Sequence, residues 1–438
     1  MKKTMLFAAL LVSMTAVAQE RAWTLSDCID YALEHNLSVQ QSGINVEQQE
    51  IALNTAESNR LPGLSGSAGQ NFSFGRGLTA DNTYANTNTT STSFSLGSDL
   101  TIFNGGRVRN NIELSKLDLE AATADLAKAK DDISVAVAQA YVQILYNQEI
   151  VEVAENQVSI DEAQVSRLKE MASNGKASRA EVSAQEATLA QSRVSLTQAR
   201  NSLSLSILDL TQLLELPSPE GFSVVRPSAE NLTSGLLMSP EAIYEEAVGV
   251  KPVIKSEEIR LDHALKNIDL AKGAFLPSVS MSAGLGTNFY TSSGYESNPF
   301  FTQLKNNFSQ YIGVNLNVPI FSRYSNRNQL KSANLALRNQ EIQLENTKKQ
   351  LFKEIQQAYY NAVAAQEKFA SCETAARSAK DAFDLAQAKY EGGKAGITEY
   401  NEAKGRYVSA ESNLVQARYE NLYQSKLLDF YRGQELMF

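Results

Sequence analysis

The sequence predicts a mainly α-helical chain with a smaller transmembrane β portion, built as two tandem repeats. Three observations support this fold class. Apolar residues recur at a 3.5-residue spacing over long segments, which is typical of coiled-coil helices. Other segments alternate apolar and polar residues, as strands do. The same order of segments also returns 218 residues later, which indicates an internal duplication.

The longest apolar seam covers residues 351–390, where steps of four and three residues meet an apolar residue every time. The equivalent steps over residues 133–172 meet only two polar residues, Asn147 and Asp161. A seam with this period predicts a left-handed coiled coil. Each seam lies in a predicted helix of roughly 100 Å, at about 1.5 Å rise per residue.

The repeats are predicted at residues 19–216 and 241–431, with a connector over 217–240 and a C-terminal tail over 432–438. Helices are predicted over about 24–60, 105–173, 178–215, 241–275, 325–390 and 397–431. The first of these segments holds two, a short opening helix at 27–36 and a longer one that follows to residue 60. Strands are predicted over about 63–74, 92–103, 277–290 and 310–320. The segments 76–91 and 291–309, which join the strands of each pair, are predicted as loops.

Residues 1–18 have the organisation of a signal peptide. Lys2 and Lys3 precede an apolar run, and Ala16 and Ala18 provide the small residues of a cleavage site. Loss of the two lysines changes the formal charge from −9 to −11. We therefore expect export from the cytoplasm, and the negative charge argues against a nucleic-acid partner.

The strand segments are long enough to cross a bilayer when tilted. Ten of the seventeen phenylalanines lie within residues 61–103 and 275–321, and one face of each strand carries mainly Ser, Gly or Asn. A soluble β-subdomain packed on helices is the alternative. The membrane interpretation is favoured because a signal peptide, a polar strand face and long polar loops coincide. Four strands alone would leave two edges unpaired in lipid. Closure therefore requires several chains, as when three chains form a twelve-stranded barrel continued by a tube of helices.

Two repeated strand pairs, each flanked by long helices, resemble the TolC family of outer-membrane efflux proteins over essentially the whole mature chain. The supporting segments are two turns at 174–181 and 393–399, Leu-Pro pairs at 61–62 and 276–277, and Ile320-Phe321 before a long helix. The resemblance implies a homotrimer, with its barrel in contact with outer-membrane lipid of a Gram-negative bacterium and an α-helical barrel in the periplasm. It also implies binding to a periplasmic adaptor (membrane fusion) protein and an inner-membrane pump. The cargo would be drugs, toxic compounds or secreted proteins.

The same resemblance places Glu399 and Glu402 at the periplasmic entrance, where the family has aspartates. These residues share one helical face, and three copies would gather six carboxylates around one axis and attract cations. The alternative for Glu399 is a helix cap, because its counterpart Glu181 follows Ser178 in a capping-box pattern. For Glu181 the cap is favoured; for Glu399 both interpretations stay open.

The two turns project from the same end of the predicted helices, so we expect the adaptor to contact both tips. The tip residues are Gly175, Lys176, Gly393 and Lys394. Neither turn has the glycine spacing or the Ser/Thr after lysine that a phosphate-binding loop needs.

No nucleophile–base pair emerges, and His35 and His263 lack a second imidazole at metal-ligand spacing. The sequence therefore predicts a non-enzyme with no cofactor and no metal site. It favours the exit duct of a tripartite efflux or type I secretion system. The alternative is a non-transport periplasmic stalk or structural protein anchored in the outer membrane. A polar strand face favours the duct, because a sealed anchor does not need one.

Overall fold

The computed structural model describes residues 22–78, 81–227 and 237–437. The predicted signal peptide and part of the predicted connector lie outside these ranges. No helix within them is long and apolar enough to cross a membrane. The described residues form two compact units: 22–41, 128–227, 237–251 and 350–437 make the first, and 42–78, 81–127 and 252–349 make the second. Each unit therefore combines segments of both repeats.

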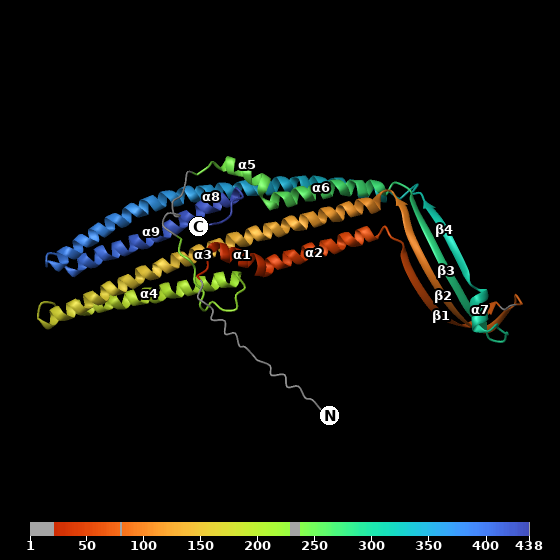
Figure 1. Ribbon diagram of the computed structural model, residues 1–438, viewed down its shortest axis with the longest axis horizontal. Coiled ribbons are helices and arrows are strands. Elements are labelled where there is room, and N and C mark those ends of the chain that lie inside the picture. Colours follow the sequence, from red (N-terminus) through yellow and green to blue (C-terminus); the bar gives the residue numbers. More distant parts are fainter. Residues whose placement is uncertain (1–21, 79–80, 228–236, 438) are drawn as a thin grey trace, which may run out of the picture. The chain divides into compact units, whose positions relative to one another are not determined.

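The first unit is helical and is built around two antiparallel hairpins (Figure 1). One hairpin pairs the end of α3 (Arg107–Ser173) with α4 (Arg179–Leu213), and the other pairs the end of α8 (Ser325–Glu391) with α9 (Ile397–Tyr431). Helices α1 (Leu25–His35) and α5 (Pro240–Val250) also belong to this unit. No proline interrupts the α3 or α8 segment, which allows 67 residues of unbroken helix in each.

The apolar seams form much of the core of this unit. Val137, Ile144 and Ile355 are fully buried, and alanines fill half of the positions of the second seam. The two polar positions of the first seam, Asn147 and Asp161, are also buried. Buried polar groups need hydrogen-bond partners, so these two residues mark specific contacts rather than general packing.

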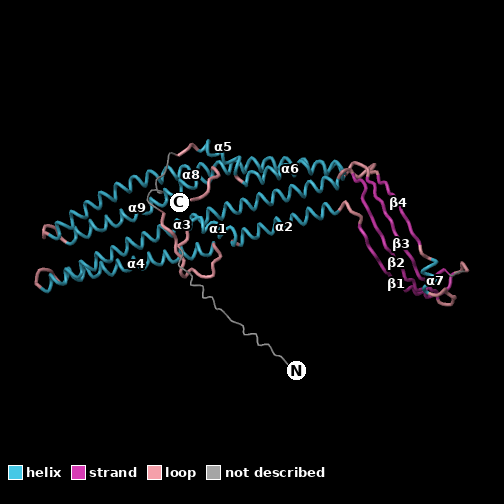
Figure 2. Tube along the Cα trace, viewed as in Figure 1, coloured by secondary structure: helices cyan, strands magenta, loops and turns pink. Residues whose placement is uncertain are grey.

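The second unit contains a four-stranded antiparallel sheet in the order β1-β2-β3-β4 (Figure 2). The strands are β1 (Gly63–Leu78), β2 (Tyr84–Asn104), β3 (Ser278–Ser292) and β4 (Ser309–Asn317). The unit also contains α6 (Pro252–Gly273), α7 (Phe300–Asn306), most of α2 (Leu37–Ser58) and the first parts of α3 and α8. Strands β1 and β4 are the two edges of this sheet.

The strand register separates a polar and an apolar face. One row across the sheet joins Ser65, Gly97, Gly284 and Tyr311, and the next joins Leu64, Ser98, Ala283 and Ile312. Neighbouring rows point to opposite faces. The serine- and glycine-rich rows therefore share one face, and the leucines and phenylalanines share the other.

Both predicted loops between paired strands need correction. In the segment 76–91, β1 continues to Leu78 and β2 begins at Tyr84, with Thr89 and Thr90 paired in the ladder. Threonine favours strands, so a Thr/Asn-rich segment is compatible with pairing. In the segment 291–309, the helix α7 occupies Phe300–Asn306. A helix of seven residues is too short to leave a periodic pattern.

The prediction of one helix over 241–275 also needs correction, because the structure has two helices there. α5 ends at Val250, and α6 begins at Pro252. Lys251 between them has an extended conformation, φ −71° and ψ 125°. The ring of a following proline disfavours helical geometry in the residue before it, which explains the break.

Candidate functional site: the helix tips and the contacts behind them

The two hairpin tips in the first unit have the same backbone geometry. Gly175 and Gly393 have φ values of +71° and +69°, the left-handed conformation that glycine adopts without strain. The next residues, Lys176 and Lys394, each donate a backbone hydrogen bond of 2.8 Å to a carbonyl five residues earlier. This is the Schellman arrangement, and it leaves both lysine side chains exposed beyond the last helical turn.

The start of α4 has the predicted capping box. The Ser178 hydroxyl accepts from the Glu181 backbone N–H at 3.2 Å, and the Ser178 N–H donates to Glu181 Oε2 at 2.7 Å. The Ser178 N–H, together with the Ser178 hydroxyl that donates to Oε2 at 2.9 Å, lowers the pKa of the Glu181 carboxyl from its usual 4.5. The start of α9 differs, because its N-cap is Gly396, which has no side chain to accept such a bond. The interpretation of Glu399 as part of a full capping box is therefore wrong, because Gly396 has no side chain that could accept from the Glu399 backbone N–H.

Glu399 and Glu402 lie on the exposed surface of α9 beside basic residues. Glu399 Oε1 lies 3.9 Å from Lys389 Nζ, and Glu402 Oε2 lies 3.4 Å from Arg406 Nη2. Both carboxylates are more than half exposed, so these pairs are weak and leave the charges available to solvent. Arg406 could have been predicted from its i,i+4 spacing.

A shallow groove lies beside Glu402. Its volume is about 540 Å³, and it is lined by residues of α8 and α9: Cys372, Ala375, Glu402, Gly405, Arg406, Ser409, Ala410 and Asn413. Small side chains on both helices keep it open. The groove adds a polar and charged surface to the α8–α9 hairpin.

Behind the tips, Asp161 is the centre of a buried polar network. Its Oδ1 accepts from Gln185 at 3.1 Å and from the Lys404 ammonium. Its Oδ2 accepts from Ser192 at 2.6 Å and Gln157 at 2.7 Å. Asp161 is 0 % exposed and Lys404 4 % exposed. Donors from α3, α4 and α9 therefore compensate the buried charge and link the two hairpins.

Tyrosines continue this link toward the tips. The Gln164 side chain donates to the Tyr390 hydroxyl at 2.7 Å, and Arg167 lies over the Tyr390 ring. Tyr390 in turn stacks on Tyr400, with ring centroids 5.2 Å apart. Burial raises the pKa of Tyr400 to about 12, so its phenol stays neutral at physiological pH.

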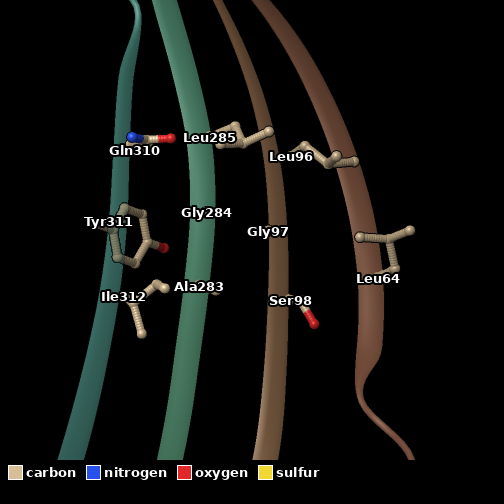
Figure 3. Close-up of a pocket in the computed structure, with 10 residues that line it drawn as sticks. All are labelled: Leu64, Leu96, Gly97, Ser98, Ala283, Gly284, Leu285, Gln310, Tyr311 and Ile312. Atoms are coloured by element: carbon tan, nitrogen blue, oxygen red, sulfur yellow. The ribbon is translucent and has the colours of Figure 1, made fainter.

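In the second unit, a hollow of about 530 Å³ lies on the sheet, lined by residues of all four strands (Figure 3). The Tyr311 ring lies against Gly284 on the opposite, polar face of the sheet. A Cβ added to Gly284 would lie 2.6 Å from a Tyr311 ring carbon, so only glycine leaves room for this ring. Leu64, Leu96 and Leu285 provide the apolar lining.

Sequence patterns therefore predict part of this local geometry. The glycine turns and the Ser178–Glu181 cap follow from local motifs, whereas the contacts of Lys404 and Tyr390 were missed. The available signal was Asp161, a charged residue on an apolar seam. Among the described residues, no group of three His, Cys, Asp or Glu side chains is placed to hold a metal ion.

Two sequence comparisons find relatives. The profile of the outer membrane efflux protein family matches residues 28–215 and again 243–434. The outer membrane protein TolC of Vibrio cholerae serotype O1 is 29 % identical over 188 residues. This match covers 42 % of the chain and 41 % of that relative, so the alignment spans less than half of the relative's length.

Solved structures share the fold. The CmeC outer membrane channel of Campylobacter jejuni superimposes with a TM-score of 0.79 at 19 % identity, covering 94 % of this chain and 87 % of that one. The MtrE outer membrane channel of Neisseria gonorrhoeae, in its open state, gives a TM-score of 0.75 at 22 % identity, covering 93 % and 88 %. A membrane protein from Pseudomonas aeruginosa gives 0.77 at 21 % identity, covering 93 % and 92 %.

Proposed function

The chain belongs to the outer membrane efflux protein family, and on that premise we propose that it is the outer-membrane exit duct of a tripartite efflux or type I secretion system. Three copies form one channel that passes small molecules or proteins to the exterior. The observation that carries the proposal is the two-faced sheet with unpaired edges at β1 and β4. In lipid such edges must pair, and a ring of sheets pairs all of them.

The sheet faces support a lumen on one side and lipid on the other. The polar rows carry Ser65, Ser67, Ser93 and Ser95, whereas Phe72, Phe94 and Ile312 lie on the apolar face. Ile312 is 80 % exposed in the single chain, which is costly in water and favourable in hydrocarbon. A water-filled lumen against the polar face explains both sets of residues.

Exposed apolar residues on the helices support association of copies. On α2, Ile44 and Ile51 are a heptad apart and 55 % and 68 % exposed. On α8, Leu335 and Ile342 have the same spacing and are also more than half exposed. Apolar columns at heptad spacing are typical of helix–helix seams, so neighbouring copies are the natural partners for these columns.

The test of this proposal is the mass and shape of the protein extracted from outer membranes in mild detergent. Native mass spectrometry gives the number of subunits, and negative-stain images show whether the particle has a lumen. Three subunits around a lumen, with ion conductance in planar bilayers, are expected. A monomer, or a solid rod without conductance, would support the structural stalk instead.

The tips are proposed to bind the periplasmic adaptor, which in turn connects to an inner-membrane pump. Lys176 and Lys394 are exposed beyond rigid glycine caps, and they offer two positive charges at repeated positions. A photo-crosslinking amino acid at either position should capture co-expressed adaptor. The same probe at Lys353, an exposed position of α8 far from the tip in sequence, is the control. Equal capture at all three positions would argue against a specific tip contact.

A further inference from the structure

Helix α7 is attached to one particular face of the sheet. Two residues of β3 contact it: the Thr287 hydroxyl donates to the Leu304 carbonyl at 2.6 Å, and the Phe289 ring packs on Phe300 at 5.0 Å between centroids. Thr287 pairs with Phe94 of β2, so both contacts lie in apolar rows. Because side chains alternate along a strand, α7 leans on the apolar face and away from the serine-rich face.

The helix is also fixed to the edge of β3 where β4 has ended. Pairing between β3 and β4 stops at Gly286 and Ser309. Beyond it, the buried amide of Gln303 donates to the Tyr290 carbonyl and accepts from the Tyr290 N–H, both at 3.0 Å. It thereby satisfies the backbone groups that a strand would otherwise pair. The position of α7 is thus set by hydrogen bonds as well as by packing.

The outer surface of α7 is aromatic. Phe300 and Phe301 contact each other edge to face at 5.4 Å, and Phe301 is 81 % exposed. Phe308, just before β4, is 56 % exposed. Lys305 is the single charged residue of α7 and lies in its last turn. Exposed phenylalanines beside one lysine fit the boundary between acyl chains and headgroups, where aromatic rings insert and an ammonium reaches phosphate.

The distance along β3 places α7 at such a boundary. The helices join the strands at the Ser278 end of β3, and Thr287 is nine residues further. At about 3.4 Å per residue and a tilt of about 35–45°, nine residues rise about 22–25 Å. The apolar band of outer-membrane barrels is about 25 Å tall. When the inner limit of the band is placed at Ser278, where the strands begin, α7 lies at the outer limit of the band.

We propose that α7 is an interfacial anchor that inserts Phe301 into the outer leaflet of the membrane, at the boundary between headgroups and acyl chains. The inference rests on the proposed function, because it requires the apolar sheet face to contact lipid. The partner is the lipid surface itself. There are two alternatives to lipid: α7 contacts a neighbouring copy of the chain, or it faces the channel lumen. The test separates both from the proposal.

Tryptophan fluorescence in nanodiscs tests the proposal. The chain has one tryptophan, so Trp23→Phe gives a background without indole. Phe301→Trp is added to this background, and emission is recorded in phosphatidylcholine with or without bromine at acyl carbons 6 and 7 or 11 and 12. We expect blue-shifted emission that is quenched several-fold more strongly by bromine at 6 and 7.

Two matched variants separate the outcomes. Ile312→Trp, on the apolar face near mid-strand, should be quenched best by bromine at 11 and 12. Tyr311→Trp, on the polar face, should respond to aqueous acrylamide and not to bromine. If Ile312→Trp is quenched by bromine and Phe301→Trp is not, the anchor is wrong while the channel stands. Acrylamide then distinguishes an α7 in water, in the lumen or outside the membrane, from one covered by another copy. If neither is quenched by bromine, the membrane barrel itself is wrong.

Discussion

Lys404 of α9 and Asp161 of α3 form an ion pair in which both side chains are withdrawn from water and 243 residues separate the partners. They join the α8–α9 hairpin to the α3–α4 hairpin. A buried ion pair contributes little over a well-packed apolar pair, but loss of one partner leaves an uncompensated charge. The pair therefore makes the relative position of the two hairpins specific.

Lys404→Met should lower the free energy of unfolding of the helical unit by about 3–5 kcal/mol, because the Asp161 carboxylate stays buried without its cation. Denaturant titration followed by helical circular dichroism measures the loss. The double variant Asp161→Asn with Lys404→Met should recover most of it. A double variant as unstable as the single one would show that the charge pair is not the cause.

Replacing Glu399 and Glu402 by Gln should reduce the cation selectivity of the channel several-fold in single-channel recordings. Three copies would remove six exposed carboxylates from the proposed entrance. Glu181→Gln is the matched control, because Glu181 occupies the equivalent position in the first repeat but is engaged in a cap. Unchanged selectivity in the double variant would place the narrowest ring elsewhere.

Gly105→Ala should reduce the yield of folded protein much more than Gly106→Ala. Both glycines have positive φ, so each alanine costs about 1–2 kcal/mol of conformational strain. A Cβ on Gly105 would also lie 2.2 Å from the Gly273 carbonyl oxygen, whereas a Cβ on Gly106 meets nothing within 4 Å. Yield and thermal midpoint in detergent measure the difference, and equal effects would show that the close approach relaxes.

The cap at the start of α4 should weaken at acid pH. The pKa of Glu181 is lower in the folded chain than in the unfolded chain, so its contribution is complete above pH 4.5 and is lost as the pH falls through the lowered value. Hydrogen exchange of the peptide covering 178–184, corrected for intrinsic rates, should show falling protection below pH 4.5. In Glu181→Gln this dependence should be absent; its persistence would implicate another group.

The order of elements could be predicted from sequence because each helix and strand carries its own period. The Ser178–Glu181 cap was predictable because it is local, with all its atoms within four residues. The α7 helix was not predictable, because seven residues make too few turns and its position depends on Gln303 meeting the Tyr290 backbone. Lys404 was not predictable either, because a heptad pattern shows which face of a helix is apolar but not which other hairpin it meets.

The glycine at position 284 has a consequence for the bore of the proposed channel. Because Gly284 has no side chain, the Tyr311 ring lies across its backbone, with three side-chain atoms within 2.9 Å of the place that a Cβ would occupy. In a trimer, one substitution acts at three points of the same circumference. In the proposed trimeric barrel, a valine at this position would displace three rings toward the axis at once, so one residue of the sequence would set the aperture at this level.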